Sequence, residues 1–407
     1  MKNIVSHSGE VFIEKSYIKL FIRFLRYGLL AWGGPIAQLA LIEKEMVYEE
    51  KLISIQYFNR LIAVYQTFPG PETHEICVHL GTQAKGFLGG LLAGLGFMLP
   101  GFILAIFVSW LYKLYGITAI ATSILLGIKP AVSAWICKGG VQLGHGILIS
   151  PLLWLIAMGA FFAELYQVNF IITFIASGGF YVLCSHISLR LTIKRTVKFI
   201  IKYIWIIIAL VSIIVGLVFL FYFKNIPFTI ISEKASIVST FIFGFKCGSL
   251  SFGSVYTILS IIKTEAIIKN NWLTQSQFID GLALTGILPA PFIIVTTFVG
   301  YLAYGFWGGV FATLGTFLVP TVIPIFGHKY LNRIGTSGAI RTLLDGITAG
   351  VAGLIAADMF DILKQVLINP LTISIFICSL LFIYFYKSTY AIIWIVLIGG
   401  LLGVMLS

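Results

Sequence analysis

"QTFPGPETHE", residues 66–75, interrupts a chain that is otherwise strongly apolar. Pro69 and Pro71 lack amide hydrogens, and Gly70 between them adds backbone freedom, so no regular helix continues through this stretch. A proline suits the first turn of a helix, and the residues after Pro71 are compatible with one. We therefore predict a new helix that starts beside Pro71, with ionisable side chains in its first turns and its amide ends aimed into the protein.

The composition is typical of a polytopic membrane protein. Of the 407 residues, 59% are hydrophobic and 10% are charged, whereas soluble domains carry about 25% charged residues. Apolar runs long enough to cross a bilayer recur along the chain, for example over residues 86–110, 152–183 and 200–222. The sequence therefore predicts an all-α, multi-pass protein of the cell membrane, with the lipid bilayer as a partner.

The net charge of +12 is best explained by membrane orientation. Cytosolic loops retain Lys and Arg, so this excess of positive charge gives no reason to expect nucleic acid. Two basic clusters are predicted to lie in the cytosol: Lys15, Lys19, Arg23 and Arg26, and then Arg190, Lys194, Arg195, Lys198 and Lys202. The five cysteines have no metal-ligand spacing, so we expect neither a metal nor another cofactor.

The chain repeats itself. "FIRFLRYGLLAWGG" from Phe21 aligns with "FIFGFKCGSLSFGS" from Phe241 at an offset of 220 residues. The same offset aligns Pro69 and Pro71 with Pro289 and Pro291. We predict a cytosolic tail over 1–16, a first transmembrane repeat over 17–186, a basic linker with one connecting span over 187–236, and a second repeat over 237–407.

The single connecting span predicts that the two repeats are inverted. The first repeat begins and ends beside a basic cluster, so it crosses the membrane an even number of times if both clusters are cytosolic. One further span then starts the second repeat on the other side. Inverted repeats with broken, re-entrant or half-helices around a midplane site are a common transporter architecture.

Both repeats carry two helix breaks. Pro35 follows Gly33 and Gly34 in the first half, and "FGSVYTILSII" and "LPAPFIIVTTFVG" occupy the matching places in the second. Four helix N-termini could converge on one pocket, and helix N-termini favour an anion. The alternative is that these breaks mark loops at the membrane surface.

Two cations and one acid complete the predicted site. Arg26 and Lys246 are related by the repeat and lie in apolar surroundings, so they could face one dianion, although snorkelling to the surface is the alternative. Glu72, at the predicted helix start, is the proton-coupling candidate. We expect ordinary ion pairs or an exposed helix end for His74 and His79. We expect loop or interface positions for Asp280 and Asp345, with a role as a coupling acid as the alternative for either.

Several motifs resemble the chromate ion transporter family, in its long two-repeat form. "GLLAWGGPIAQLALIEKEMV", "TFPGPETHEICVHLG" and "GGLLAGLGFMLPG" carry the resemblance, which covers nearly the whole chain. It implies two homologous halves, export of chromate (a structural mimic of sulfate), and substrate contacts at Gly33, Gly34, Pro35, Pro69, Gly70, Pro71, Glu72, Gly253, Pro289 and Pro291. The chain departs from the family pattern at Ser254 and Ala290, where a glycine is usual.

The predicted function is secondary transport of a tetrahedral oxyanion, chromate or sulfate, bound near the midplane between the repeats. An intramembrane enzyme is the first alternative, but no cluster of nucleophile, base and orienting residue is evident. A scaffold that carries no flux is the second, and it leaves the recurrence of both breaks unexplained. The sequence leaves a homodimer open.

Overall fold

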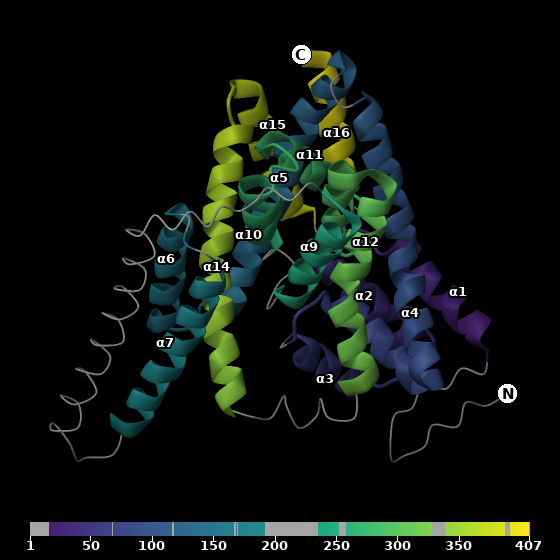
Figure 1. Ribbon diagram of the computed structural model, residues 1–407, viewed down its shortest axis with the longest axis vertical. Coiled ribbons are helices and arrows are strands. Elements are labelled where there is room, and N and C mark those ends of the chain that lie inside the picture. Colours follow the sequence, from purple (N-terminus) through teal and green to yellow (C-terminus); the bar gives the residue numbers. More distant parts are fainter. Residues whose placement is uncertain are drawn as a thin grey trace.

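The computed structural model describes residues 16–66, 68–115, 118–166, 168, 170–191, 235–251, 258–327, 338–386 and 391–406. Every regular element within these ranges is helical (Figure 1). In the part of the chain that the structure describes, four helices are long and apolar enough to cross a membrane, at Glu72–Tyr115, Ile120–Ile147, Phe292–Gly327 and Thr342–Val366. The all-helical, polytopic prediction is confirmed.

The described part of the first half contains eight helical elements. They are α1 (Tyr17–Leu30), α2 (Pro35–Glu43), the π-helical turn η1 (Lys44–Glu49), α3 (Ile55–Tyr65), α4 (Glu72–Tyr115), α5 (Ala119–Ile147), α6 (Pro151–Leu165) and α7 (Phe170–Leu191).

The described part of the second half follows the same order. Its elements are α9 (Ile237–Ser249), α10 (Ile258–Ile262), the π-helical η3 (Lys263–Lys269), α11 (Gln275–Thr285), the 3₁₀ turn η4 (Phe292–Ile294), α12 (Val295–Gly327), α14 (Gly338–Val366), α15 (Pro370–Phe385) and α16 (Ala391–Leu406).

Backbone details recur between the halves as well. Helix α4 changes direction at Gly86, with φ 64°, and α12 does so at Gly305, with φ 63°. Lys51 and Asn271 are the described non-glycine residues with positive φ, and they too are matched by the offset of 220. The N-terminal segment of α4, up to the change at Lys85, rises about 20 Å, which is short of a bilayer core of about 30 Å.

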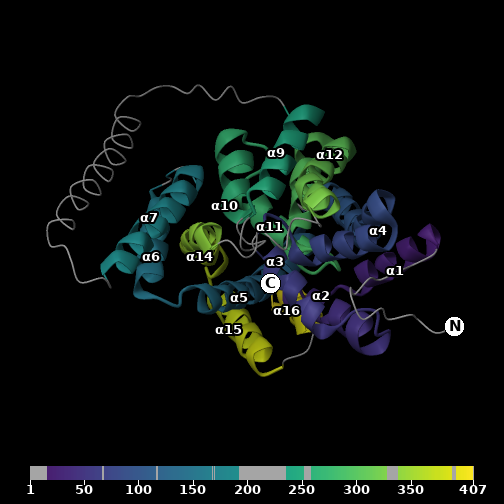
Figure 2. The same ribbon diagram turned by 90° about the horizontal axis from the view of Figure 1, so that it is seen from below.

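One long helix of each half packs against helices of the other half. Helix α5 packs against α15 and α16, whereas α14, which holds the equivalent place in the second half, packs against α6 and α7 (Figure 2). Close approach depends on small residues, since a Cβ on Gly399 would meet the Gly127 carbonyl oxygen at 2.7 Å. Membrane helices associate through such small-residue contacts because lipid provides no hydrophobic drive between them.

Candidate functional site: the meeting of the helix breaks

The helix breaks of the two halves contact each other. The Gly70 amide donates a hydrogen bond to the Ser251 carbonyl at 3.3 Å. The Gln38 side-chain amide donates to the carbonyls of Ala31 at 3.2 Å and Ala290 at 2.8 Å. The offset of 220 matches Ala31 to Ser251 and Ala290 to Gly70. The same two positions therefore meet twice, once directly and once through Gln38.

Helix α2 begins at Pro35, directly after the glycine pair, as predicted. Gly33 and Gly34 have φ of 92° and 83°, which side-chain-bearing residues rarely adopt. A Cβ on Gly34 would lie 2.5 Å from the Trp135 ring. No side chain caps α2, so its first amides have no intrahelical or capping partner and could bind an anion.

Helix α4 begins at Glu72, immediately after Pro71, which confirms the predicted start. Gly70 has φ 144°, and a Cβ there would lie 2.8 Å from Pro320 and 3.1 Å from the Glu75 carboxyl carbon. The absence of a side chain at this position lets α12 and the first turn of α4 close onto the break. Pro69, Gly70 and Pro71 are all buried.

The matching break in the second half has a different backbone. Ala290 replaces the glycine and does not adopt positive φ. After Pro291 the chain makes the 3₁₀ turn η4 before α12 begins. Pro289 and Pro291 are buried, and Ala290 is held by Gln38. The repeat therefore preserves the place of the break but not its conformation.

Glu75 is the most isolated polar group at this site. Its side chain is fully buried, and neither carboxyl oxygen has a hydrogen-bond partner among the described residues. His74 is also buried and places Nε2 3.1 Å from the Thr321 hydroxyl, with its ring against Phe317. An exposed helix end was the wrong prediction for His74, because α12 covers it.

His79 lies one turn further along α4 and is held by two tyrosines of α3. Its Nδ1 is 2.8 Å from the Tyr65 hydroxyl and its Nε2 is 2.9 Å from the Tyr57 hydroxyl. The Gln83 side-chain amide donates to the same Tyr57 hydroxyl. An exposed position was therefore the wrong prediction for His79 as well.

These ionisable groups belong to the first half alone. The positions that match them in the second half are all apolar: Phe292, Ile294, Val295 and Val299. The break at Gly70 therefore carries the titratable chemistry, while the break at Ala290 is a purely apolar counterpart.

The repeat-related cations Arg26 and Lys246 each bind a glutamate that is also related by the repeat. Arg26 lies 2.7 Å from Glu45, and Lys246 lies 2.7 Å from Glu265. The side chains of Arg26 and Lys246 are 58% and 40% exposed. Neither cation is fully buried, and each has its charge balanced by a carboxylate.

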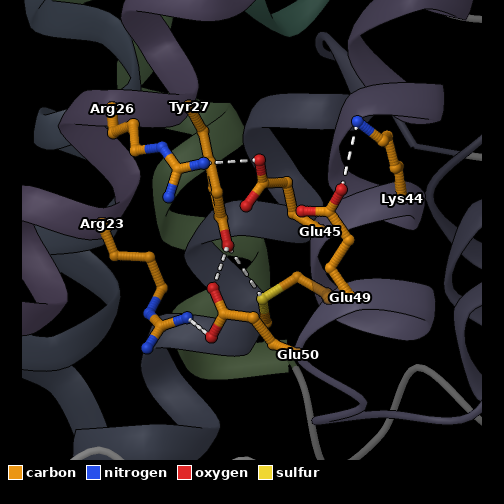
Figure 3. A network of polar contacts seen from close by, with 8 residues as sticks. Arg23, Arg26, Tyr27, Lys44, Glu45, Glu49 and Glu50 are labelled. Atoms are coloured by element: carbon orange, nitrogen blue, oxygen red, sulfur yellow. Dashed lines mark hydrogen bonds and ion pairs between the residues drawn. The ribbon is translucent and has the colours of Figure 1, made fainter.

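Figure 3 shows how the first-half network is built. Arg26 extends from α1 to Glu45 of η1, and Arg23 extends from the same helix to Glu50. The Tyr27 hydroxyl, between them, lies 3.5 Å from the second Glu50 oxygen. The charged stretch after α2 is therefore tied to α1.

A second buried ionic cluster was not anticipated as a unit. Lys263 lies 2.6 Å from Asp361, 3.5 Å from Asp358 and 3.7 Å from Glu164. Asp358 also accepts a hydrogen bond from Ser260. The cluster joins α6 of the first half to η3 and α14 of the second.

One of the sparse acids was misplaced in the prediction. Asp280 is buried, 2.6 Å from Lys129 and 2.7 Å from the Tyr112 hydroxyl, so a loop or interface position was wrong for it. Asp358, for which the sequence predicted no position, is also buried. An isolated acid in an apolar helix would have been the signal, since such a group needs a partner inside the membrane.

Some predicted features lie outside the described residues. They are Gly253 and Ser254, the connecting span over 200–222, and the cytosolic tail as far as residue 15.

Long apolar helices, broken at glycine–proline steps around buried ionisable groups, define a multi-pass membrane transport protein. The family model described as chromate transporter matches residues 18–183 and 238–404, so the chain belongs to the chromate transporter family. Members of that family are transport proteins rather than enzymes.

Relatives span most of this chain. It is similar to the chromate transport protein of Pseudomonas aeruginosa, with 40% identity over 95% of this chain and 92% of the relative. It is 28% identical to the probable chromate transport protein of Synechococcus elongatus, over 84% and 83% of the two chains. The chromate transport protein of Cupriavidus metallidurans is 24% identical, over 89% and 87%. No solved structure matches the chain.

Proposed function

We propose that this protein carries chromate across the cell membrane and binds the dianion where the helix breaks of the two halves meet. The observation that carries this proposal is the paired contact of Gly70 with Ser251 and of Gln38 with Ala31 and Ala290. We propose that these two contacts lie at one buried place, where helix starts from both halves come together. The names of the relatives supply the substrate class.

The binding chemistry is that of helix N-termini. The first amides of α2 and α4 lack intrahelical partners and carry the positive end of the helix dipole. A tetrahedral dianion could accept hydrogen bonds from both ends, lined by Gly33, Gly34, Pro35, Pro69, Gly70, Pro71 and Glu72, with Gly253, Pro289 and Pro291 opposite. Sulfate has the same shape and charge, so we propose it as a competing ligand.

Arg26 and Lys246 remain proposed substrate contacts. Because each is bound to a glutamate at 2.7 Å, a dianion would have to share the cation with that carboxylate. Their partial exposure would permit such sharing during one stage of transport. Glu72, at the α4 N-terminus, is the proton-coupling candidate that the sequence indicates, but it is only half-buried, whereas Glu75 is fully buried.

We further propose that the two repeats are inverted and that transport proceeds by alternating access. Helices α3 and α11 hold equivalent places in the two halves, and they lie toward opposite ends of the molecule along its long axis (Figure 1). The break that follows each of these helices contacts the first break of the other half. This arrangement favours a pseudo-twofold axis through the site, which would lie in the membrane plane.

Proteoliposomes containing the purified protein test this function. We expect saturable chromate flux, inhibited by sulfate, above that of protein-free vesicles. Folded, correctly inserted protein that carries neither anion would overturn the transport proposal and favour a scaffold.

A further inference from the structure

We propose that Glu75 is the proton-binding group of this transporter, that it takes up one proton when the anion binds, and that a row of polar side chains between α3 and α4 delivers that proton. This inference rests on the proposed anion site at the α4 N-terminus. It concerns a residue to which the family resemblance assigns no role and which the sequence places only within a group of acids and histidines at the start of α4.

The burial and isolation of Glu75 give the first argument. Its carboxyl carbon lies 3.1 Å from where a Gly70 Cβ would be, so the carboxyl adjoins the break itself. The side chain is fully buried and both oxygens lack hydrogen-bond partners among the described residues. A buried charge without a partner is very unfavourable, whereas the neutral acid is tolerated.

No described cation balances Glu75. Glu72 on its own helix adds negative charge, and Tyr65 of α3 lies within electrostatic range. The neighbouring residue of α12, Pro320, carries no charge. Among the charged groups on elements packed against α4, Arg23 pairs with Glu50, Arg26 with Glu45, and Asp280 with Lys129. Lys19 and Arg60 are exposed, and Glu43 of α2 is half-buried.

Electrostatic repulsion between the anion and Glu75 would couple anion binding to proton binding. An oxyanion at the α4 N-terminus would lie beside the Glu75 carboxyl, and two negative charges at that distance repel. Protonation of Glu75 converts its carboxylate to a neutral carboxylic acid and removes this repulsion. By linkage, proton binding and anion binding each strengthen the other.

A row of polar side chains lies beside Glu75, and none of the described residues hydrogen bonds to its carboxyl oxygens. Glu75, His79 and Gln83 are spaced by four residues, so they share one face of α4. Tyr65 and Tyr57 of α3 face them and hydrogen bond to the two His79 nitrogens. Tyr57 and Gln83, at the far end, are only partly buried. Hydroxyl and imidazole groups arranged in a row can pass a proton inward, because each group can both donate and accept a hydrogen bond.

The second half provides an internal comparison. The positions that match this row there are Gln277, Thr285, Val295, Val299 and Ala303. They include no titratable side chain, although the surrounding helices are alike. Simple preservation of the repeat therefore does not account for the polar row.

Calorimetric titration of the protein in nanodiscs, in two buffers of different ionisation enthalpy, tests the proposal. Sulfate is the primary ligand because it stays a dianion at neutral and mildly acidic pH, so any proton taken up during the titration goes to the protein. Chromate is titrated alongside it. We expect about one proton taken up per sulfate bound, with sulfate affinity falling about tenfold per pH unit above the pKa of Glu75.

The Glu75→Gln variant should bind sulfate with almost no proton uptake and with affinity that no longer depends on pH. Glu49→Gln, at an exposed glutamate of η1, is the matched control and should behave as the wild type. The row is tested separately by stopped-flow with a pH indicator. Tyr65→Phe should slow proton uptake without changing its stoichiometry, and Tyr48→Phe, at an exposed tyrosine, should not.

The outcomes separate the two proposals. Folded wild-type protein that binds neither sulfate nor chromate would overturn the proposed function. Wild-type protein that binds sulfate without proton uptake would overturn the role of Glu75 and leave the anion site standing, and this result does not depend on the variant folding. Unchanged proton uptake in Glu75→Gln would also overturn the role of Glu75. An unchanged rate of proton uptake in Tyr65→Phe would show that the polar row does not deliver the proton.

Discussion

The Gly70 amide donates to the carbonyl of Ser251, 181 positions further along the chain, at 3.3 Å. The equivalent positions, Ala31 and Ala290, are joined by the side chain of Gln38. Two contacts of this kind, related by the internal repeat, bring the first break of each half against the second break of the other. The proposed anion site follows from this exchange.

Gly70→Ala is expected to destabilise the protein and abolish transport. The new Cβ would require an unfavourable φ and would lie 2.8 Å from Pro320, for a cost of about 1–3 kcal/mol from strain before the clash is counted. Thermal unfolding in detergent measures the loss. Gly86→Ala is the matched control, since Gly86 also has positive φ but has open space around it. Equal stability of the two variants would contradict the packing assigned to Gly70.

Gln38→Leu is expected to weaken the link between the halves. It removes the donor to two buried carbonyls, those of Ala31 and Ala290, and unsatisfied buried groups cost about 1–3 kcal/mol. The thermal unfolding midpoint should fall, and chromate flux should fall with it. Gln56→Leu, at an exposed position of α3, should change little. A Gln38→Leu protein with wild-type stability and flux would show that this bridge is dispensable.

Lys246→Gln and Glu265→Gln should act in opposite directions on chromate affinity. If the dianion shares Lys246 with Glu265, loss of the lysine should weaken binding about fivefold, or about 1 kcal/mol, and loss of the glutamate should strengthen it. Equilibrium binding in nanodiscs checks both. Unchanged affinity in both variants would leave Lys246 as a structural ion-pair partner only.

Lys263→Met is expected to be strongly destabilising. It would leave Glu164, Asp358 and Asp361 without their shared cation, and breaking a buried pair costs about 3–5 kcal/mol. Lys364→Met, at an exposed position of α14, is the control. The unfolding midpoint of Lys263→Met should therefore fall well below that of Lys364→Met, and similar midpoints would contradict the cluster's role in joining α6 to α14.

Helix starts were predictable from the sequence because their causes are local. Glycine conformations and the missing amide hydrogens of proline specify a break wherever they occur, so the starts at Pro35 and Glu72 needed no tertiary information. The repeat was also readable, since glycines and prolines are not determined by hydrophobicity. The offset aligns α9, α11 and the kinked α12 with α1, α3 and α4.

Partners of ionisable side chains were not predictable, because they come from distant segments. The prediction of exposed positions for His74 and His79 was wrong because α12 covers the first side chain and α3 covers the second. Glu75 shared its helix face with His79 in the sequence, yet only the packing of Gly70 and Pro320 around it makes its isolation evident. The bridge made by Gln38 gave no sequence signal, since one glutamine in an apolar helix has no fixed partner.

The most direct test of the anion site is the position of bound chromate in a crystal of the protein, located from the anomalous scattering of chromium. If the anion binds at the helix starts, we expect a chromium peak within hydrogen-bonding distance of the first amides of α2 or α4, beside Gly34 and Gly70. A peak far from both helix starts, in crystals where chromate binding is established, would contradict it.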